Sequence, residues 1–245
     1  MSRPNKVAIV TGASRGIGRA IASRLASDGF AVVVNYVSNP AEAEQAVGEI
    51  SASGAQAVAI QADVSKAGDV TGLFEQTEKR FGGVDVLVNN AGIMDLKALS
   101  DTPDELFERT FAINVRGTFN TMRAAAKVLR KGGRIINFST SVLGLSLPTY
   151  GVYRASKAAV EALTKTAAKE FRGKNITVNA VAPGPTATDL FLRGKSAGEV
   201  ENFKKMPPLE RLGTPEDIAN VVSFLAGKDG AWINGQTIRA NGGMV

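Results

Sequence analysis

The chain of 245 residues is 44% hydrophobic and 21% charged, carries a formal net charge of +6, and contains no histidine and no cysteine. Its length and composition suit one globular domain. The missing residue types exclude disulfides, thiol nucleophiles, thiolate zinc sites and iron–sulfur clusters, and they remove the usual proton carrier near neutral pH.

The positive charge is scattered along the chain. Its densest groups, KVLRKGGR at 127–134 and the pair Lys204 and Lys205, are short and have no neighbouring aromatic residues for base stacking. Apolar runs stay well below the roughly 18 residues of a spanning helix, and the first residues lack a targeting pattern. We therefore expect a cytoplasmic protein with no metal, no nucleic-acid partner and no membrane contact.

Short β-rich runs alternate with longer helical patterns. The first, second, fourth and fifth runs are nearly continuous in apolar residues, which is typical of strands covered by helices on both faces. The pattern predicts a parallel α/β sandwich made of one domain, residues 1–245. One stretch, 184–214, interrupts the alternation, and loops of this length are usually functional or mobile. The predicted strands are 6–11, 31–35, 55–63, 84–90, 134–140, 176–183 and 236–241.

A glycine-rich turn, TGASRGIG at 11–18, follows the first predicted strand and opens an amphipathic helix. Gly12, Gly16 and Gly18 have the spacing G-x-x-x-G-x-G, one residue longer than the usual dinucleotide fingerprint. We interpret Gly12 as permitting the tight turn, Gly16 as clearing the approach of a pyrophosphate, and Gly18 as allowing close packing of helix and strand. The turn therefore predicts a dinucleotide site at a helix amino terminus.

The second predicted strand ends without the Asp or Glu that would hold the ribose 2′-hydroxyl of NAD. Asn35, Tyr36 and Ser38 are neutral at this point, so a 2′-phosphate would meet no repelling carboxylate, and we predict all three as cofactor contacts. Arg15 in the glycine turn could donate to that phosphate as a charged fork. We therefore expect NADP(H) as the cofactor.

Five motifs, taken together, resemble the classical short-chain dehydrogenase/reductase family. They are TGASRGIG, NNAG at 89–92, Asn114 in FAINVRG, YRASK at 153–157 and PGPTAT at 183–188. The likeness runs from about residue 5 to the end and is greatest to carbonyl reductases that include 3-oxoacyl thioester reductases and hydroxynaphthalene-reductase-like enzymes. It implies a Rossmann-type, doubly wound domain with a seven-stranded parallel sheet, and a homotetramer.

The resemblance also implies a set of cofactor contacts. The glycine turn and the NNAG segment would follow the dinucleotide, Asp63 would meet the adenine, and the 183–188 loop would hold the nicotinamide carboxamide. The segment after Thr188, about 189–212, would be a lid over the substrate. The implied contacts are Gly12, Ser14, Arg15, Gly16, Ile17, Gly18, Asp63, Val64, Asn90, Ala91, Gly92, Tyr153, Lys157, Pro183, Gly184, Thr186 and Thr188.

A tyrosine and a lysine are the candidate proton carriers. Tyr153 and Lys157 stand four residues apart in a helical pattern, so both fall on one helix face. Bringing a tyrosine pKa from about 10 to 7 takes about 4 kcal/mol, and a lysine cation about 4 Å away supplies roughly that at an effective dielectric of 20. Tyr150, spaced to pair with Arg154, is the competitor, but arginine stays charged and is a poor relay. The resemblance selects Tyr153 as the acid that protonates a carbonyl, with Lys157 lowering its pKa and binding the nicotinamide ribose.

The resemblance further implies a hydroxyl, after the fifth predicted strand, that binds the substrate oxygen. Counting along the strand selects Thr140, whereas the local pattern S-V-x-G selects Ser141, and either hydroxyl could stabilise developing oxyanion charge. Asn114 resembles the asparagine that anchors a water relay behind the lysine.

The leading prediction is an NADP-dependent oxidoreductase that acts on a ketone or a secondary alcohol. A 3-oxoacyl-[acyl-carrier-protein] reductase is the runner-up, and a catalytically silent NADP-binding sensor or scaffold is the alternative from another class. For the runner-up, the residues that would dock an acidic carrier are Arg123, Lys127 and Arg130. The residues that suggest an apolar substrate pocket are Ile93, Met94, Leu143, Leu145 and Leu147.

Overall fold

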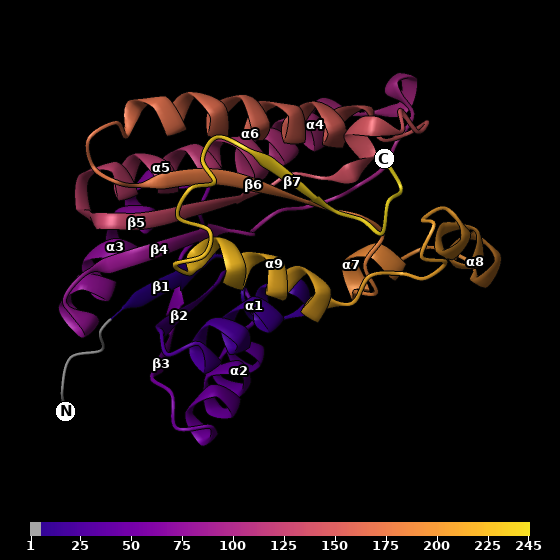
Figure 1. Ribbon diagram of the computed structural model, residues 1–245. Coiled ribbons are helices and arrows are strands. Elements are labelled where there is room, and N and C mark those ends of the chain that lie inside the picture. Colours follow the sequence, from indigo (N-terminus) through magenta and orange to yellow (C-terminus); the bar gives the residue numbers. More distant parts are fainter. Residues whose placement is uncertain (1–5) are drawn as a thin grey trace.

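The computed structural model describes residues 6–245 and confirms the predicted doubly wound α/β fold (Figure 1). Seven parallel strands form one sheet in the order β3-β2-β1-β4-β5-β6-β7. The strands are β1 Val7–Val10, β2 Ala31–Tyr36, β3 Ala57–Gln61, β4 Val84–Asn89, β5 Leu129–Phe138, β6 Thr177–Pro183 and β7 Thr237–Ala240. The prediction that the first residues lack a targeting pattern falls partly on residues 1–5, which lie outside the described residues.

Helices cover both faces of the sheet (Figure 1). On one face lie α1 Gly16–Ser27, α2 Pro40–Ala52 and α9 Pro215–Ala226. On the other lie α3 Ala67–Phe81, α4 Asp104–Phe111, α5 Gly117–Val128 and α6 Gly151–Glu170. Two short helices, α7 Asp189–Leu192 and α8 Ala197–Lys205, stand beyond the carboxyl ends of the strands. Within residues 6–245, no helix combines the length and the apolar character needed to cross a bilayer.

The central strands β1, β2 and β4 are largely apolar because each is packed on both sides. In β1, Ala8 and Val10 belong to the core beneath α1, α2 and α9, whereas Val7 and Ile9 belong to the core beneath α3, α5 and α6. All four side chains are fully buried. Alternate residues of a strand point to opposite faces, so a strand with two covered faces needs apolar residues at every position. This is the physical basis of the continuous apolar runs.

One strand begins earlier than predicted. The strand β5 starts at Leu129 rather than 134, and its register against β4 jumps from Val84 opposite Leu129 to Val86 opposite Arg134. Arg130 pairs with Asp85 of β4 at 2.9 Å, and Gly132 takes a positive φ of 85° within the irregular stretch. The basic run at 127–134 therefore covers the end of α5 and the irregular start of β5, which an ion pair joins to the neighbouring strand β4.

The segment 184–214 is also more ordered than its mixed composition suggests. It contains α7 and α8, and α8 begins with a capping box in which Ser196 and Glu199 bond reciprocally to each other's backbone amides. Such a cap satisfies amide donors at the start of the helix. Helical periodicity is weak in such short elements, so pattern reading missed them.

The chain reverses its winding direction at β1. From β1 the chain goes to β2 on one side, and after β3 it crosses to β4 on the other. In an open parallel sheet, this reversal leaves a crevice at the carboxyl ends of the two central strands. The glycine turn follows β1 and the NNAG segment follows β4, so both motifs meet at this crevice.

Candidate functional site

Two adjoining hollows lie along the carboxyl ends of the strands. The larger, of about 1460 Å³, follows the glycine turn, and the smaller, of about 840 Å³, lies beside Tyr153. Residues common to both walls show that one hollow leads into the other: Ile17, Asn90, Gly92, Ile93, Thr188 and Leu190.

The glycine turn is shaped by close backbone contacts. Gly12 has a φ of +60°, and a Cβ there would lie 3.0 Å from the Cα of Ala91. A Cβ at Gly18 would lie 2.4 Å from the carbonyl oxygen of Gly12 and 2.5 Å from Nδ2 of Asn90. That amide group of Asn90 donates to the carbonyl oxygens of Thr11, at 2.9 Å, and Gly12, at 3.0 Å. The amino terminus of α1 is thus held against the end of β4, with room only for glycine.

The larger hollow gathers most of the predicted cofactor contacts. Its wall also includes residues that the sequence reading did not name: Val37, Asn39, Glu42, Ile113, Asp189 and Leu190. The predicted residues in this wall are Gly12, Ser14, Arg15, Gly16, Ile17, Gly18, Tyr36, Ser38, Asp63, Val64, Asn90, Ala91, Gly92 and Thr188.

Asn35 does not lie in this wall, which corrects its predicted role as a cofactor contact. Its side chain is fully buried, and Nδ2 donates to the carbonyl oxygens of Ile60, at 3.2 Å, and Ala62, at 3.0 Å. Its Oδ1 accepts from the backbone amide of Gly12 at 3.3 Å. A buried amide must satisfy its polar atoms internally. Asn35 therefore braces the glycine turn from behind.

Charge in the larger hollow is also more mixed than expected. The end of β2 is neutral, as the sequence indicates, but the carboxylate-bearing residues Glu42, at the start of α2, and Asp189 line the same hollow as Arg15. The start of a helix favours acidic residues because of the helix dipole. Tertiary packing of α2 against β2 and β3 brings Glu42 to the hollow.

Tyr153 and Lys157 lie on one face of α6 and both line the smaller hollow. The Nζ atom of Lys157 donates to the carbonyl oxygen of Phe138 at 2.8 Å and lies 5.9 Å from the centroid of the Tyr153 ring. The predicted pair therefore shares one site. Tyr150 contacts Tyr153 edge-on, with ring centroids 6.5 Å apart, and lines the same hollow.

The two hydroxyl candidates after β5 have different surroundings. Thr140 lines the smaller hollow together with Tyr153, and its Oγ1 accepts from the backbone amide of Val142 at 3.3 Å. Ser141 is 1% exposed, donates to the carbonyl oxygen of Ala182 at 2.9 Å, and accepts from Nδ2 of Asn241 at 3.0 Å. Thr140, and not Ser141, thus shares the wall of this hollow with Tyr153.

Asn114 lies fully buried in a π-helical turn, Ala112–Arg116. Its Nδ2 donates to the carbonyl oxygen of Ile93 and to Oγ of Ser156, each at 3.0 Å, and its Oδ1 accepts from the amide of Ile93 at 2.9 Å. A Cβ at Gly92 would lie 3.2 Å from Asn114 Oδ1 and 3.4 Å from Lys157 Nζ. Asn114 and Lys157 therefore pack against the same backbone segment, and the π-turn is of the kind that often occurs at functional sites.

Burial controls the proton affinities of the central pair. Burial raises the pKa of Tyr153 to about 12, with a smaller lowering from Thr140 and a further raising from Tyr150. Burial likewise lowers the pKa of Lys157 to about 8. The expectation that Lys157 brings the tyrosine pKa toward 7 is not met by the protein's own groups, because loss of hydration outweighs attraction when both groups are buried. Tyr153 is therefore protonated at neutral pH.

Comparison with known proteins shows the family. A family model described as enoyl-(acyl carrier protein) reductase matches residues 12–245. A short-chain type dehydrogenase/reductase of Picea abies is 48% identical, over 98% of this chain and 92% of that protein. The chain belongs to the short-chain dehydrogenase/reductase family. It is therefore an oxidoreductase.

Two further similar proteins bear on the site. One is an Arabidopsis thaliana protein named NADPH-dependent aldehyde reductase 2, chloroplastic, 47% identical over 98% of this chain and 94% of that protein. The other is a solved structure of a short-chain dehydrogenase from Burkholderia cenocepacia in complex with NADP. It is 36% identical, with a TM-score of 0.93, and the match covers 98% of this chain and 97% of that one.

The smaller hollow of this short-chain dehydrogenase/reductase has a largely apolar wall. Of the apolar residues expected there, Ile93, Met94 and Leu145 line it. The sequence reading missed Phe203 and Met244, because neither lies in a periodic element next to a motif. The end of β6, the loop after it and α7 supply further wall residues: Pro183, Gly184, Pro185, Thr186, Thr188, Leu190 and Phe191.

Proposed function

We propose that this short-chain dehydrogenase/reductase is an NADP(H)-dependent carbonyl reductase that interconverts a ketone and a secondary alcohol. The observation that carries the proposal is the position of Tyr153 and Lys157 in an apolar hollow that opens into the hollow of the glycine turn. The NADP complex of the Burkholderia relative and the name of the Arabidopsis relative support the choice of cofactor.

The residues of the larger hollow fit a dinucleotide. Backbone amides at the amino terminus of α1 suit a pyrophosphate, and the missing Cβ atom of Gly16 would let it approach. Asp63 and Val64 would border the adenine, Tyr36 and Ser38 its ribose, and the 183–188 loop the nicotinamide. The bound cofactor would supply the hydride.

Side chains of the protein would supply the proton that the reduction requires. In reduction the carbonyl carbon gains a hydride, and the carbonyl oxygen takes the proton of the Tyr153 phenol. A hydrogen bond from Thr140 would orient that oxygen and stabilise its developing charge. The Lys157 ammonium would favour the tyrosinate left behind, and Asn114 would hold the backbone beside it.

The rate of reduction should depend on pH through Lys157. Because its pKa is about 8, Lys157 is mostly a cation at pH 7 and becomes neutral as the pH rises, while Tyr153, at about 12, keeps its proton. We expect kcat/KM for ketone reduction to be level below pH 7 and to fall above pH 8, by about tenfold per pH unit for one titrating group. Initial rates from pH 6 to 10, with NADPH affinity measured at each pH, check this. A level profile to pH 10 would contradict it.

The cofactor preference should depend on Arg15. A charge-assisted bond from Arg15 to a 2′-phosphate is worth about 1.5–3 kcal/mol. We therefore expect Arg15→Ala to raise the KM for NADPH by about 10- to 100-fold and to leave that for NADH nearly unchanged. Steady-state assays on a panel of ketones with each cofactor measure this and test the function itself.

The matched control is Arg172→Ala, which removes the same charge beyond the far end of α6. Faster use of NADH than NADPH by the unmodified protein would overturn the cofactor assignment. Tight NADPH binding without turnover of any ketone would favour the silent sensor instead.

An acyl-carrier substrate is the second candidate, and the description of the matching family model favours a relation to carrier-linked chemistry. The proposed docking cations are partly engaged, since Arg130 pairs with Asp85 and the guanidinium of Arg123 lies 5.0 Å from the Phe119 ring centroid. We therefore keep the small ketone as the first choice. Reduction of carrier-linked 3-oxoacyl chains much faster than free ketones would reverse that order.

We also propose a homotetramer in the cytoplasm. Large aromatic side chains are exposed on two separate surfaces, Phe107 and Phe119 on α4 and α5, and Phe224 and Trp232 around α9 and the loop after it. Exposed apolar patches of this kind commonly mark protein contacts. Sedimentation analysis giving the mass of a single chain would refute the assembly.

A further inference from the structure

The base of the proposed lid consists of two chain segments lying side by side. The backbone amide of Gly213 donates to the carbonyl oxygen of Pro185 at 2.8 Å, and the amide of Ala187 donates to the carbonyl oxygen of Gly213 at 2.9 Å. These bonds form a parallel bridge between Thr186 and Gly213. The chain thus leaves the 183–188 loop, forms α7 and α8, and returns at Gly213 to lie beside Thr186.

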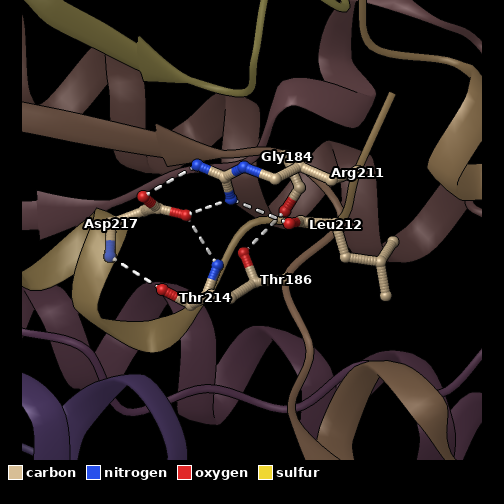
Figure 2. A network of polar contacts seen from close by, with 6 residues as sticks. All are labelled: Gly184, Thr186, Arg211, Leu212, Thr214 and Asp217. Atoms are coloured by element: carbon tan, nitrogen blue, oxygen red, sulfur yellow. Dashed lines mark hydrogen bonds and ion pairs between the residues drawn. The ribbon is translucent and has the colours of Figure 1, made fainter. Parts of the chain in front are cut away.

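An arginine fork ties the returning segment to α9 (Figure 2). The guanidinium of Arg211 contacts both carboxylate oxygens of Asp217, at 2.5 and 3.1 Å, and donates to the carbonyl oxygen of Leu212 at 3.0 Å. Asp217 Oδ2 also accepts from the amide of Thr214 at 2.8 Å, and the Asp217 amide donates to Oγ1 of Thr214 at 3.2 Å. The bidentate geometry fixes direction as well as distance.

Helix capping accounts for the position of Asp217 but does not require its ion pair with Arg211. The reciprocal bonds of Thr214 and Asp217 form a complete capping box at the start of α9. Arg211 lies outside that box, in the segment returning from the lid, and uses a carboxylate that the cap already places. Its guanidinium and the Thr214 amide hold the pKa of Asp217 at about 2, so the fork persists across the working pH range.

The fork lies only a few residues from the smaller hollow. Gly213 lies against Thr186, since a Cβ there would be 3.4 Å from Thr186 Oγ1. The Thr186 side chain is buried and donates to the carbonyl oxygen of Gly184 at 3.0 Å (Figure 2). Gly184 and Thr186 both line the hollow that contains Tyr153. On the other side, α9 is anchored in the core by residues such as Ile218, so it offers a rigid support.

We propose that the Arg211–Asp217 pair positions the base of the lid against the 183–188 loop and so preorganises that loop for NADP(H). This inference rests on the proposed function. Arg211 touches neither of the proposed reacting groups and acts through Gly213 and Thr186. Both charged side chains are about half exposed, and exposed pairs contribute little to global stability. The effect of breaking the pair is therefore local to the loop and the lid.

The experiment compares Arg211→Met with Arg19→Met. The control breaks a similar fork, from Arg19 to Glu49, on the outer surface of α1 and α2. For Arg211→Met we expect the dissociation constant of NADP⁺ to rise about tenfold. We also expect chymotrypsin to cut the lid at Phe191 and Phe203 several times faster than in the unmodified protein. Added NADP⁺ should slow this cleavage less in Arg211→Met than in the unmodified protein. Both variants should melt within about 3 °C of the unmodified protein. Arg211→Lys should recover part of the affinity, since a point cation can still reach Asp217.

Equal NADP⁺ affinity and equal lid cleavage in Arg211→Met and Arg19→Met would overturn the positioning role. A large drop in melting temperature in Arg211→Met, without change in cleavage of the native protein, would overturn it too, because it would assign the pair to general stability. If the unmodified protein does not bind NADP⁺, the proposed function fails. Lid cleavage then decides the role of the pair alone, with faster cutting of Arg211→Met supporting it.

Discussion

Replacement of Tyr153 by phenylalanine should lower kcat for ketone reduction by about 10²- to 10⁴-fold, the usual contribution of a general acid. The variant keeps the buried ring and its contacts with Tyr150 and Lys157, so the affinity for NADPH should stay close to that of the unmodified protein. Because the pKa of Tyr153 is about 12, the phenol is the protonated donor at neutral pH, and no other group in the proposed scheme supplies this proton. Single-turnover rates and NADPH fluorescence titration measure the two effects separately.

The matched comparison is Tyr150→Phe, which removes the hydroxyl of the neighbouring tyrosine in the same hollow. Its loss of turnover should be far smaller than that of Tyr153→Phe. Near-normal turnover in Tyr153→Phe would exclude the proposed acid. Loss of turnover in Tyr150→Phe alone would transfer the role to Tyr150.

Replacement of Gly18 by alanine should abolish NADP(H) binding and destabilise the fold. The new methyl group would lie 2.4 Å from the Gly12 carbonyl oxygen and 2.5 Å from Asn90 Nδ2, so the turn or the end of β4 must move. Overpacking of this kind costs about 1–3 kcal/mol or more, which corresponds to a fall in melting temperature of roughly 2–12 °C for a chain of this size. Calorimetry and NADPH titration measure the two losses.

Gly48→Ala serves as the control, because a Cβ at Gly48 would meet nothing within 4 Å in the middle of α2. Alanine favours the helix over glycine by about 0.5–1 kcal/mol, so this variant should melt slightly higher and bind NADPH normally. Unchanged NADPH binding in Gly18→Ala would show that the close packing at Gly18 does not shape the cofactor site.

Sequence patterns were sufficient for the strands and for the central pair of side chains. Nearly continuous apolar runs marked four of the seven strands, because a strand covered on both faces buries its side chains at successive positions, as in Val7 to Val10. The spacing of Tyr153 and Lys157 placed them on one face because a helix repeats every 3.6 residues. Both signals depend only on neighbours along the chain, so no knowledge of packing was needed to find them.

Packing between distant segments determined the rest. The sequence could not choose between Thr140 and Ser141, since the choice depends on Ala182 and Asn241, which engage Ser141 from elsewhere in the chain. Asn35 was assigned to the cofactor as a neutral residue at the end of the second predicted strand. Its bonds to the carbonyl oxygens of Ile60 and Ala62 link different strands, so the sequence alone could not reveal them. The pKa values of Tyr153 and Lys157 could not be predicted from the sequence either, because burial shifts both of them. Burial is a property of the assembled fold and not of residue spacing.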